Sequence, residues 1–239
     1  MNALARNQLV WLHAQGWAQL QARAWDAEAQ TMLAHWQCHG LPLVVCRQRV
    51  EVAPGQLCLG LPAPLQWSRR RLALTVAVAQ VAAVGAFPSL QQVAQAKPWE
   101  KAALALGRAL GACGVTARVY GSHGWQWLTH MSYLHDASDI DVSVEVPDFA
   151  TACQAAALLA AAELGPRLDG EIVFPGGQAV AWRELQRVLA GGTAQVLLKA
   201  RQSIRLATLP ELQTLGIRPN GASSPDAAQR NPGRYPNAG

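Results

Sequence analysis

Two aspartates near the middle of the chain, Asp139 and Asp141, have the spacing of a metal-binding pair. Apolar and polar residues alternate around them, and this pattern predicts a β-strand. Side chains at i and i+2 of a strand point to the same face, so the two carboxylates project together while Ile140 and Val142 point into a core. Two carboxylates on one face repel each other unless a cation lies between them. We expect Mg²⁺, which binds through one or two carboxylates together with substrate phosphates.

Gly121 and Ser122 supply the second half of the predicted site, between a short apolar strand and a helical segment. A glycine at such a turn lets the backbone approach a phosphate closely, and the free N–H groups of the following helical turn can bind it. The order of strand, Gly-Ser, helix and Asp-x-Asp strand resembles the nucleotidyltransferase fold of the polymerase-beta-like superfamily. That resemblance implies a catalytic metal pair at Asp139 and Asp141. Asp-x-Asp alone also occurs in metal-dependent glycosyltransferases and on ordinary surface strands.

A third carboxylate is expected from a neighbouring strand that follows an intervening helix. Glu171 is in that position, and Asp169, on the same strand face, is the alternative. Lys199 is predicted to bind substrate phosphates through its positive charge. The arginine run at 69–71, with Arg70 at its centre, is predicted to do the same, because guanidinium forks match phosphate oxygens. For the arginines, a solvated strand start is the open alternative.

These groups together predict the displacement of diphosphate from a nucleotide-type triphosphate by a hydroxyl group. Metal ions would stabilise the attacking and leaving oxygens. Cations such as Lys199 would offset the charge that develops, and Asp141 or Glu171 could accept the hydroxyl proton.

The composition fits a globular protein that binds an anion. The 239 residues are 51% hydrophobic and 15% charged, with a net charge of +5. Five of the fifteen acidic residues nevertheless fall between positions 136 and 148, as a cation site requires. No long Lys/Arg run suggests nucleic-acid binding. An ordinary basic surface explains the net charge equally well.

The location predicted from the sequence is the cytoplasm. The five cysteines form no CxxC pair and are odd in number, which argues against a disulfide framework or a zinc site. The N-terminus lacks a signal-peptide pattern. The most apolar run, at 72–87, is shorter than the ~20 residues of a membrane span, so we expect no membrane insertion.

The predicted fold class is α+β, in two modules and a tail. We expect residues 1–88 to form a small α+β module with a hairpin between 41 and 62. Phe87-Pro88-Ser89 marks the boundary to the nucleotidyltransferase catalytic domain, residues 89–217. In that domain we expect helices at 98–113, 149–164 and 183–189 and strands at 115–120, 168–174 and 179–182, with Asp148 as a helix N-cap. From 218 to 239 the composition becomes Pro, Asn, Gly, Ser and Ala, which predicts a disordered tail.

Two longer motifs resemble one particular family. The segment 121–142, GSHGWQWLTHMSYLHDASDIDV, and the segment 169–185, DGEIVFPGGQAVAWREL, are similar to malonate decarboxylase holo-acyl-carrier-protein synthases, also called phosphoribosyl-dephospho-CoA transferases. The resemblance covers roughly residues 8–212. It implies transfer of the phosphoribosyl-dephospho-CoA group from triphosphoribosyl-dephospho-CoA to a serine of the decarboxylase's acyl-carrier subunit, with release of diphosphate. It also implies that Gly121 and Ser122 hold the triphosphate while Asp139 and Asp141 bind Mg²⁺.

Two other functions stay open on the residues alone. One is a nucleotidyltransferase with another acceptor, either a small molecule or a different protein. The other is a non-catalytic nucleotide-binding regulator, against which the joint presence of Asp139, Asp141 and Glu171 argues.

Overall fold

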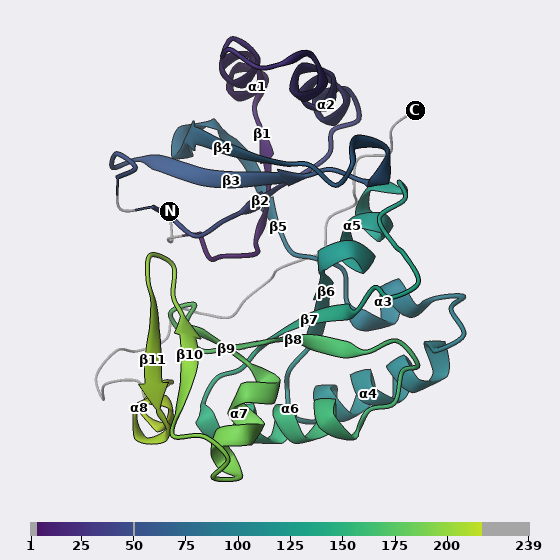
Figure 1. The fold of residues 1–239 in the computed structure, drawn as a ribbon, viewed down its shortest axis with the longest axis vertical. Coiled ribbons are helices and arrows are strands. Elements are labelled where there is room, and N and C mark those ends of the chain that lie inside the picture. Colours follow the sequence, from purple (N-terminus) through teal and green to yellow (C-terminus); the bar gives the residue numbers. More distant parts are fainter. Residues whose placement is uncertain (1–3, 50, 217–239) are drawn as a thin grey trace.

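The chain folds into two β-sheets, each covered by helices on its outer face (Figure 1). This computed structural model describes residues 4–49 and 51–216. The tail predicted at 218–239 lies outside the described residues. The mixed helix and strand content, with mostly antiparallel strands, confirms the expected α+β class.

The first sheet is antiparallel and has the strand order β4-β3-β2-β1-β5. Its strands are β1 (Leu9–Leu12), β2 (Leu43–Val45), β3 (Gln56–Pro62), β4 (Arg71–Ala77) and β5 (Val81–Gly85). Helices α1 (Ala14–Gln21) and α2 (Ala27–Cys38) lie on the side of this sheet away from the second sheet (Figure 1). The apolar run at 72–87 is therefore divided: a 3₁₀ turn (Val78–Gln80) separates β4 from β5, which crosses to pair with β1.

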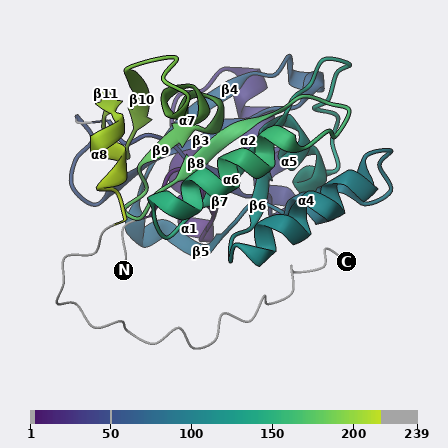
Figure 2. The same cartoon turned by 90° about the horizontal axis from the view of Figure 1, so that it is seen from below.

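The second sheet has the order β11-β10-β9-β8-β7-β6 and is antiparallel except between β7 and β8. Its strands are β6 (Ala117–Tyr120), β7 (Ile140–Glu145), β8 (Leu168–Val173), β9 (Ala179–Ala181), β10 (Gln195–Lys199) and β11 (Ile204–Thr208). Its helices are α3 (Leu90–Ala94), α4 (Glu100–Ala112), α5 (Gly121–Thr129), α6 (Phe149–Ala161), α7 (Trp182–Leu189) and α8 (Leu209–Gln213). Helices α4, α6 and α7 cover the face directed away from the first sheet (Figures 1 and 2).

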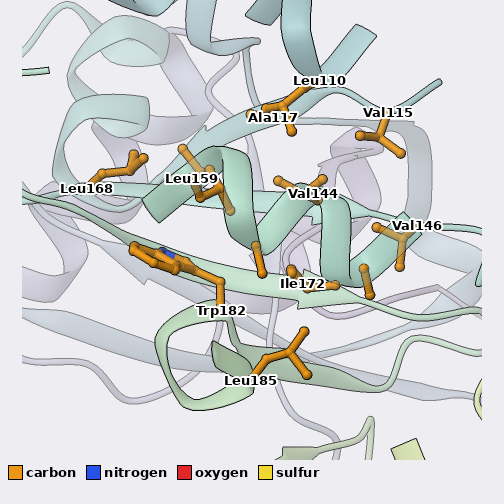
Figure 3. Close-up of a cluster of buried hydrophobic side chains, with 14 of the residues drawn as sticks. Leu110, Val115, Ala117, Val144, Val146, Leu159, Leu168, Ile172, Trp182 and Leu185 are labelled. Atoms are coloured by element: carbon orange, nitrogen blue, oxygen red, sulfur yellow. The ribbon is translucent and has the colours of Figure 1, made fainter. Parts of the chain in front are cut away.

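The core of the second sheet follows the alternation of its strands. Ile140, Val142 and Val144 are fully buried among residues of α4 and α6, so the residues between them must lie on the opposite face. Figure 3 shows Leu159 of α6 and Trp182 of α7 packed around Ile172. As predicted, Asp148 caps α6, and its Oδ1 accepts a hydrogen bond from the backbone N–H of Thr151 at 2.8 Å. The acidic side chains of β7 and β8 therefore face the first sheet.

A third apolar cluster joins the two sheets. Leu9 of β1 packs with Phe87, Trp125 of α5 and Tyr133, and all four are buried. The Tyr133 hydroxyl donates a hydrogen bond to the backbone oxygen of Pro62 at 2.9 Å. These contacts fix the positions of the two sheets relative to each other, on the faces that no helix covers.

Most elements expected in the second half are present, and the differences lie near its ends. The expected helix at 98–113 begins at Glu100, and the one at 149–164 ends at Ala161. Strand β11 and helix α8 had no counterpart in the sequence prediction. Among the helices of the described ranges, none is both long enough and apolar enough to cross a membrane.

Candidate active site

The turn from β6 into α5 brings the backbone of Gly121 against Asp141. Gly121 has φ +61°, a left-handed conformation that disfavours other residues. A Cβ atom at this position would lie 2.1 Å from Oδ2 of Asp141, which is inside van der Waals contact. Only glycine therefore allows the strand-to-helix turn and the carboxylate to approach so closely. The predicted proximity of the Gly-Ser turn to the Asp-x-Asp strand is present.

Asp141 forms part of a polar row that crosses three neighbouring strands. It pairs with Tyr120 of β6 on one side and with Asp169 of β8 on the other. The next row places Ser143 opposite Glu171. Asp139 lies directly before β7, where its carboxylate is 3.7 Å from the guanidinium of Arg167.

The guanidinium of Arg167 also lies 3.4 Å from the carboxylate of Asp169, so Arg167 connects Asp139 with Asp169. Its side chain is 60% exposed, so this connection is weak and easily displaced. The structure therefore brings Asp139, Asp141 and Asp169 to one end of β7 and β8.

The environment of Asp141 disfavours its negative charge. Burial, followed by the charges of Asp169, Asp139 and Glu171, raises the pKa of Asp141 from 3.8 to about 6. Burial, followed by the charges of Glu171 and Asp141, also raises the pKa of Tyr120. The site thus has an excess of negative potential that a bound cation would relieve.

Glu171 has a different environment from the other carboxylates. It is 4% exposed, and it accepts hydrogen bonds from Nη2 of Arg6 and, at 2.7 Å, from Nζ of Lys199. Lys199 is a predicted substrate-binding residue, whereas Arg6 was not singled out in the sequence. Both carboxylate oxygens of Glu171 are thus engaged by cations, whereas the strand register places Asp169 directly opposite Asp141.

The donor atoms of this site suit Mg²⁺. Within residues 4–49 and 51–216, no group of three or more His, Cys, Asp or Glu side chains is close enough to hold a metal ion by itself. Asp139 and Asp141, two residues apart, offer carboxylate oxygens as ligands. Mg²⁺ uses one or two carboxylates when phosphates complete its coordination. The residues present fit a metal that binds together with a phosphorylated substrate.

Arg70, the other predicted phosphate-binding residue, points away from this site. Its Nη1 donates to Oδ1 of Asp26 and to Oε2 of Glu28, both at 2.8 Å, at the start of α2. Its neighbours Arg69 and Arg71 instead line the cleft described below. The structure therefore does not bring Arg70 together with the carboxylates.

The loop that leads to Asp139 is held by the side chain of Gln126. Its Oε1 accepts hydrogen bonds from the backbone N–H groups of Tyr133 at 3.1 Å and Leu134 at 3.2 Å. Trp125, the preceding residue, belongs to the cluster that joins the sheets. The Trp-Gln pair thus fixes both the position of α5 and the approach to the carboxylates.

A cleft of about 670 Å³ lies between the open faces of the two sheets. Gly121, Ser122 and Asp141 line it from the second sheet, and residues of β2, β3 and β4 line it from the first. This volume lies within the range of small-molecule binding sites, which is roughly 300–1,000 Å³. Ser122 is therefore accessible to a ligand in this cleft, and its binding to phosphate stays a prediction.

Two residues lie beside the predicted ones, although Arg6 was not singled out in the sequence and Asp169 was named only as an alternative to Glu171. Arg6 reaches Glu171 across 165 positions of the chain, and no local pattern marks such a contact. Asp169 was marked by its spacing to Glu171, but only the pairing register places it opposite Asp141.

Comparison with known proteins gives one family over residues 5–210. Residues 5–87 match the family model of the phosphoribosyl-dephospho-CoA transferase MdcG N-terminal domain, and residues 77–210 match that of the C-terminal domain. A phosphoribosyl-dephospho-CoA transferase of Xanthomonas axonopodis pv. citri is 37% identical over 205 residues, which is 84% of this chain and 92% of the relative. One of Bradyrhizobium diazoefficiens is 37% identical over 207 residues, covering 84% and 88%. No solved structure matches the chain.

Proposed function

The chain belongs to the phosphoribosyl-dephospho-CoA transferase family, and from this we propose that it is a nucleotidyltransferase. Its donor would be triphosphoribosyl-dephospho-CoA, and its acceptor a serine of the acyl-carrier subunit of malonate decarboxylase. The serine oxygen forms a bond to the α-phosphorus of the donor, the bond from that phosphorus to the diphosphate breaks, and diphosphate leaves. The observation that carries the proposal is the contact between the Gly121 turn and Asp141 beside a ligand-sized cleft.

A polymerase-beta-like nucleotidyltransferase fold is part of this proposal. It is supported by the succession of β6, the Gly-Ser turn, α5 and the Asp-x-Asp strand β7, followed by the helical crossover to the parallel strand β8. The phosphate-binding groups and the carboxylates then meet at one end of the sheet.

Each residue of the site has a proposed task in this reaction. Gly121 and Ser122 bind the triphosphate through the start of α5. Asp139 and Asp141 hold Mg²⁺, which when bound would offset the charge of the phosphates. We assign acceptance of the serine proton to Asp169, which pairs with Asp141, rather than to Glu171, which two cations already engage.

The cations around Glu171 suit the leaving group. Arg6 and Lys199 bring two positive charges to one buried carboxylate, which leaves a net positive charge in a partly desolvated place. Preorganised cations of this kind stabilise the charge that develops on a departing diphosphate. Glu171 would then act as a positioning residue that holds both cations beside the substrate.

The test is a transfer assay with purified protein, Mg²⁺, triphosphoribosyl-dephospho-CoA and the apo acyl-carrier subunit, read by the intact mass of the carrier. We expect a mass gain equal to the phosphoribosyl-dephospho-CoA group with the wild-type protein and none with Asp139→Ala. A carrier that keeps its mass while the donor modifies a small hydroxyl compound would refute the proposed acceptor. Full transfer by Asp139→Ala would refute the metal assignment.

A further inference from the structure

The cleft beside Asp141 has a second charged region that the transfer chemistry does not use. Four arginines line the cleft, and Asp141 is the one carboxylate among its lining residues; the arginines are Arg47, Arg49, Arg69 and Arg71. All four are exposed. Within the described part of the chain, none of the four forms an ion pair with a carboxylate. Their charge is therefore available to an anionic ligand.

The backbone before β4 directs two of these arginines into the cleft. Ser68 and Arg69 have φ values of +49° and +55°, a left-handed conformation that non-glycine residues adopt only where the surrounding structure holds it. Backbone hydrogen bonds hold this turn, from the N–H of Ser68 to Leu65 at 2.9 Å and from the N–H of Arg69 to Pro64 at 3.2 Å, while the guanidinium of Arg70 is bound to Asp26 and Glu28. Arg69 and Arg71, on either side of this anchor, both reach the cleft.

Small side chains form the surface of the cleft on β3 and β4, between the arginines and Asp141. On β3 and β4 the large apolar side chains point into the core under α1 and α2, and the alternate positions carry Cys58, Gly60 and Ala73. A Cβ atom on Gly60 would lie 2.9 Å from Sγ of Cys46, so this part of the cleft surface has no room for a larger residue. These small side chains leave space for a ligand that extends along the sheet.

Resting on the proposed function, we propose that Arg69 and Arg71 bind the diphosphate that joins the adenosine and pantetheine parts of the dephospho-CoA group. The donor has two separate polyanionic groups, and Gly121, Ser122 and the metal account only for the triphosphate. A second polyanion on the same molecule requires a second group of cations along the same cleft. Guanidinium groups match diphosphate oxygens through paired, charge-assisted hydrogen bonds.

The first measurement is the affinity of the full-length protein for dephospho-CoA, which lacks the triphosphate, by titration calorimetry. We expect Arg69→Gln and Arg71→Gln each to weaken binding about tenfold, or 1.4 kcal/mol. Arg108→Gln is the matched control, because Arg108 is exposed on α4 and does not line the cleft. Adenosine, which has no phosphate, should bind wild type and both cleft variants equally.

Two outcomes would overturn the proposal. One is that wild type does not bind dephospho-CoA, or that the cleft variants bind it as Arg108→Gln does. The other is that Arg69→Gln and Arg71→Gln keep this affinity but raise the KM for the acyl-carrier subunit, which would assign the arginines to the acceptor.

Failure of the proposed function would be visible separately. Dephospho-CoA binding requires no group transfer, so arginine-dependent binding without any mass gain of the carrier would support the diphosphate site while refuting the reaction. Circular dichroism of each variant establishes that it is folded before its affinity is compared.

Discussion

Replacement of Asp141 by asparagine should stabilise the free protein while abolishing transfer. The pKa of Asp141 is raised from 3.8 to about 6, a difference of about 2 units, and each unit corresponds to 1.36 kcal/mol. The ceiling for the gain in unfolding free energy is therefore about 3 kcal/mol. Because the side chain is only partly buried, solvent screening reduces this to roughly 1–2 kcal/mol.

The dependence of this gain on pH follows from the direction in which the pKa of Asp141 is shifted. A carboxyl group whose pKa is higher in the folded than in the unfolded state costs stability when it is ionised. For Asp141 that cost is absent below pH 3.8, grows as the pH rises to about 6, and is constant above that value. The difference in unfolding free energy between Asp141→Asn and wild type should therefore open between pH 4 and pH 6.

Urea unfolding without divalent cations, followed by circular dichroism at pH 4.5, 5.5, 7 and 8, measures this difference. Glu145→Gln is the control, because Glu145 lies exposed on the same strand, β7, and its loss also removes one negative charge. We expect little change in stability for Glu145→Gln at any of these pH values.

The reasoning would be refuted if Asp141→Asn were no more stable than wild type at pH 8. It would also be refuted if the gain were the same at pH 4.5 as at pH 8, because a pH-independent gain would come from packing and not from the charge. In either case burial and the neighbouring carboxylates would not disfavour the ionised form of Asp141 as inferred.

Three further perturbations address the other parts of the site. Millimolar Mg²⁺ with inorganic triphosphate should raise the melting temperature of wild type but not of Asp141→Asn, as differential scanning fluorimetry would reveal. Gly121→Ala should abolish transfer and lower the melting temperature, because its Cβ would meet the Asp141 carboxylate at 2.1 Å. Glu171→Gln should lower the unfolding free energy in urea by about 3 kcal/mol, because it leaves Arg6 and Lys199 without their shared counter-charge; unchanged stability would show that these pairs are solvated.

The parts of the site that could be predicted from sequence are those with a local cause. Asp139 and Asp141 lie two residues apart on a strand, and the period of a strand alone places them on one face. Gly121 precedes a helix, and the need for a left-handed residue at such a turn is likewise a local property. The helix at 149–161 was recognisable from its Asp148 cap and its alanine-rich sequence.

The parts that could not be predicted depend on the register between strands and on contacts between the two sheets. Asp169 and Glu171 share a strand face, and their spacing alone does not decide which of them lies beside Asp141. The parallel register of β7 and β8 decides it, since it pairs Asp141 with Asp169. Arg6 comes from a segment before the first strand, and only the packing of one sheet over the other brings it to Glu171.

The arginine run shows that neighbouring residues of one type can lie in different surroundings, which the composition alone does not reveal. Three adjacent arginines suggested a phosphate-binding group, but the chain turns at Arg69 and enters β4 only at Arg71, so the three side chains do not share one direction. Arg70 takes the direction of α2, where Asp26 and Glu28 neutralise it, and this leaves its two neighbours for the cleft. Arg70 is thus neutralised away from the cleft, and Arg69 and Arg71 are the members of the run that line it, where a second polyanion of the donor would need their charges.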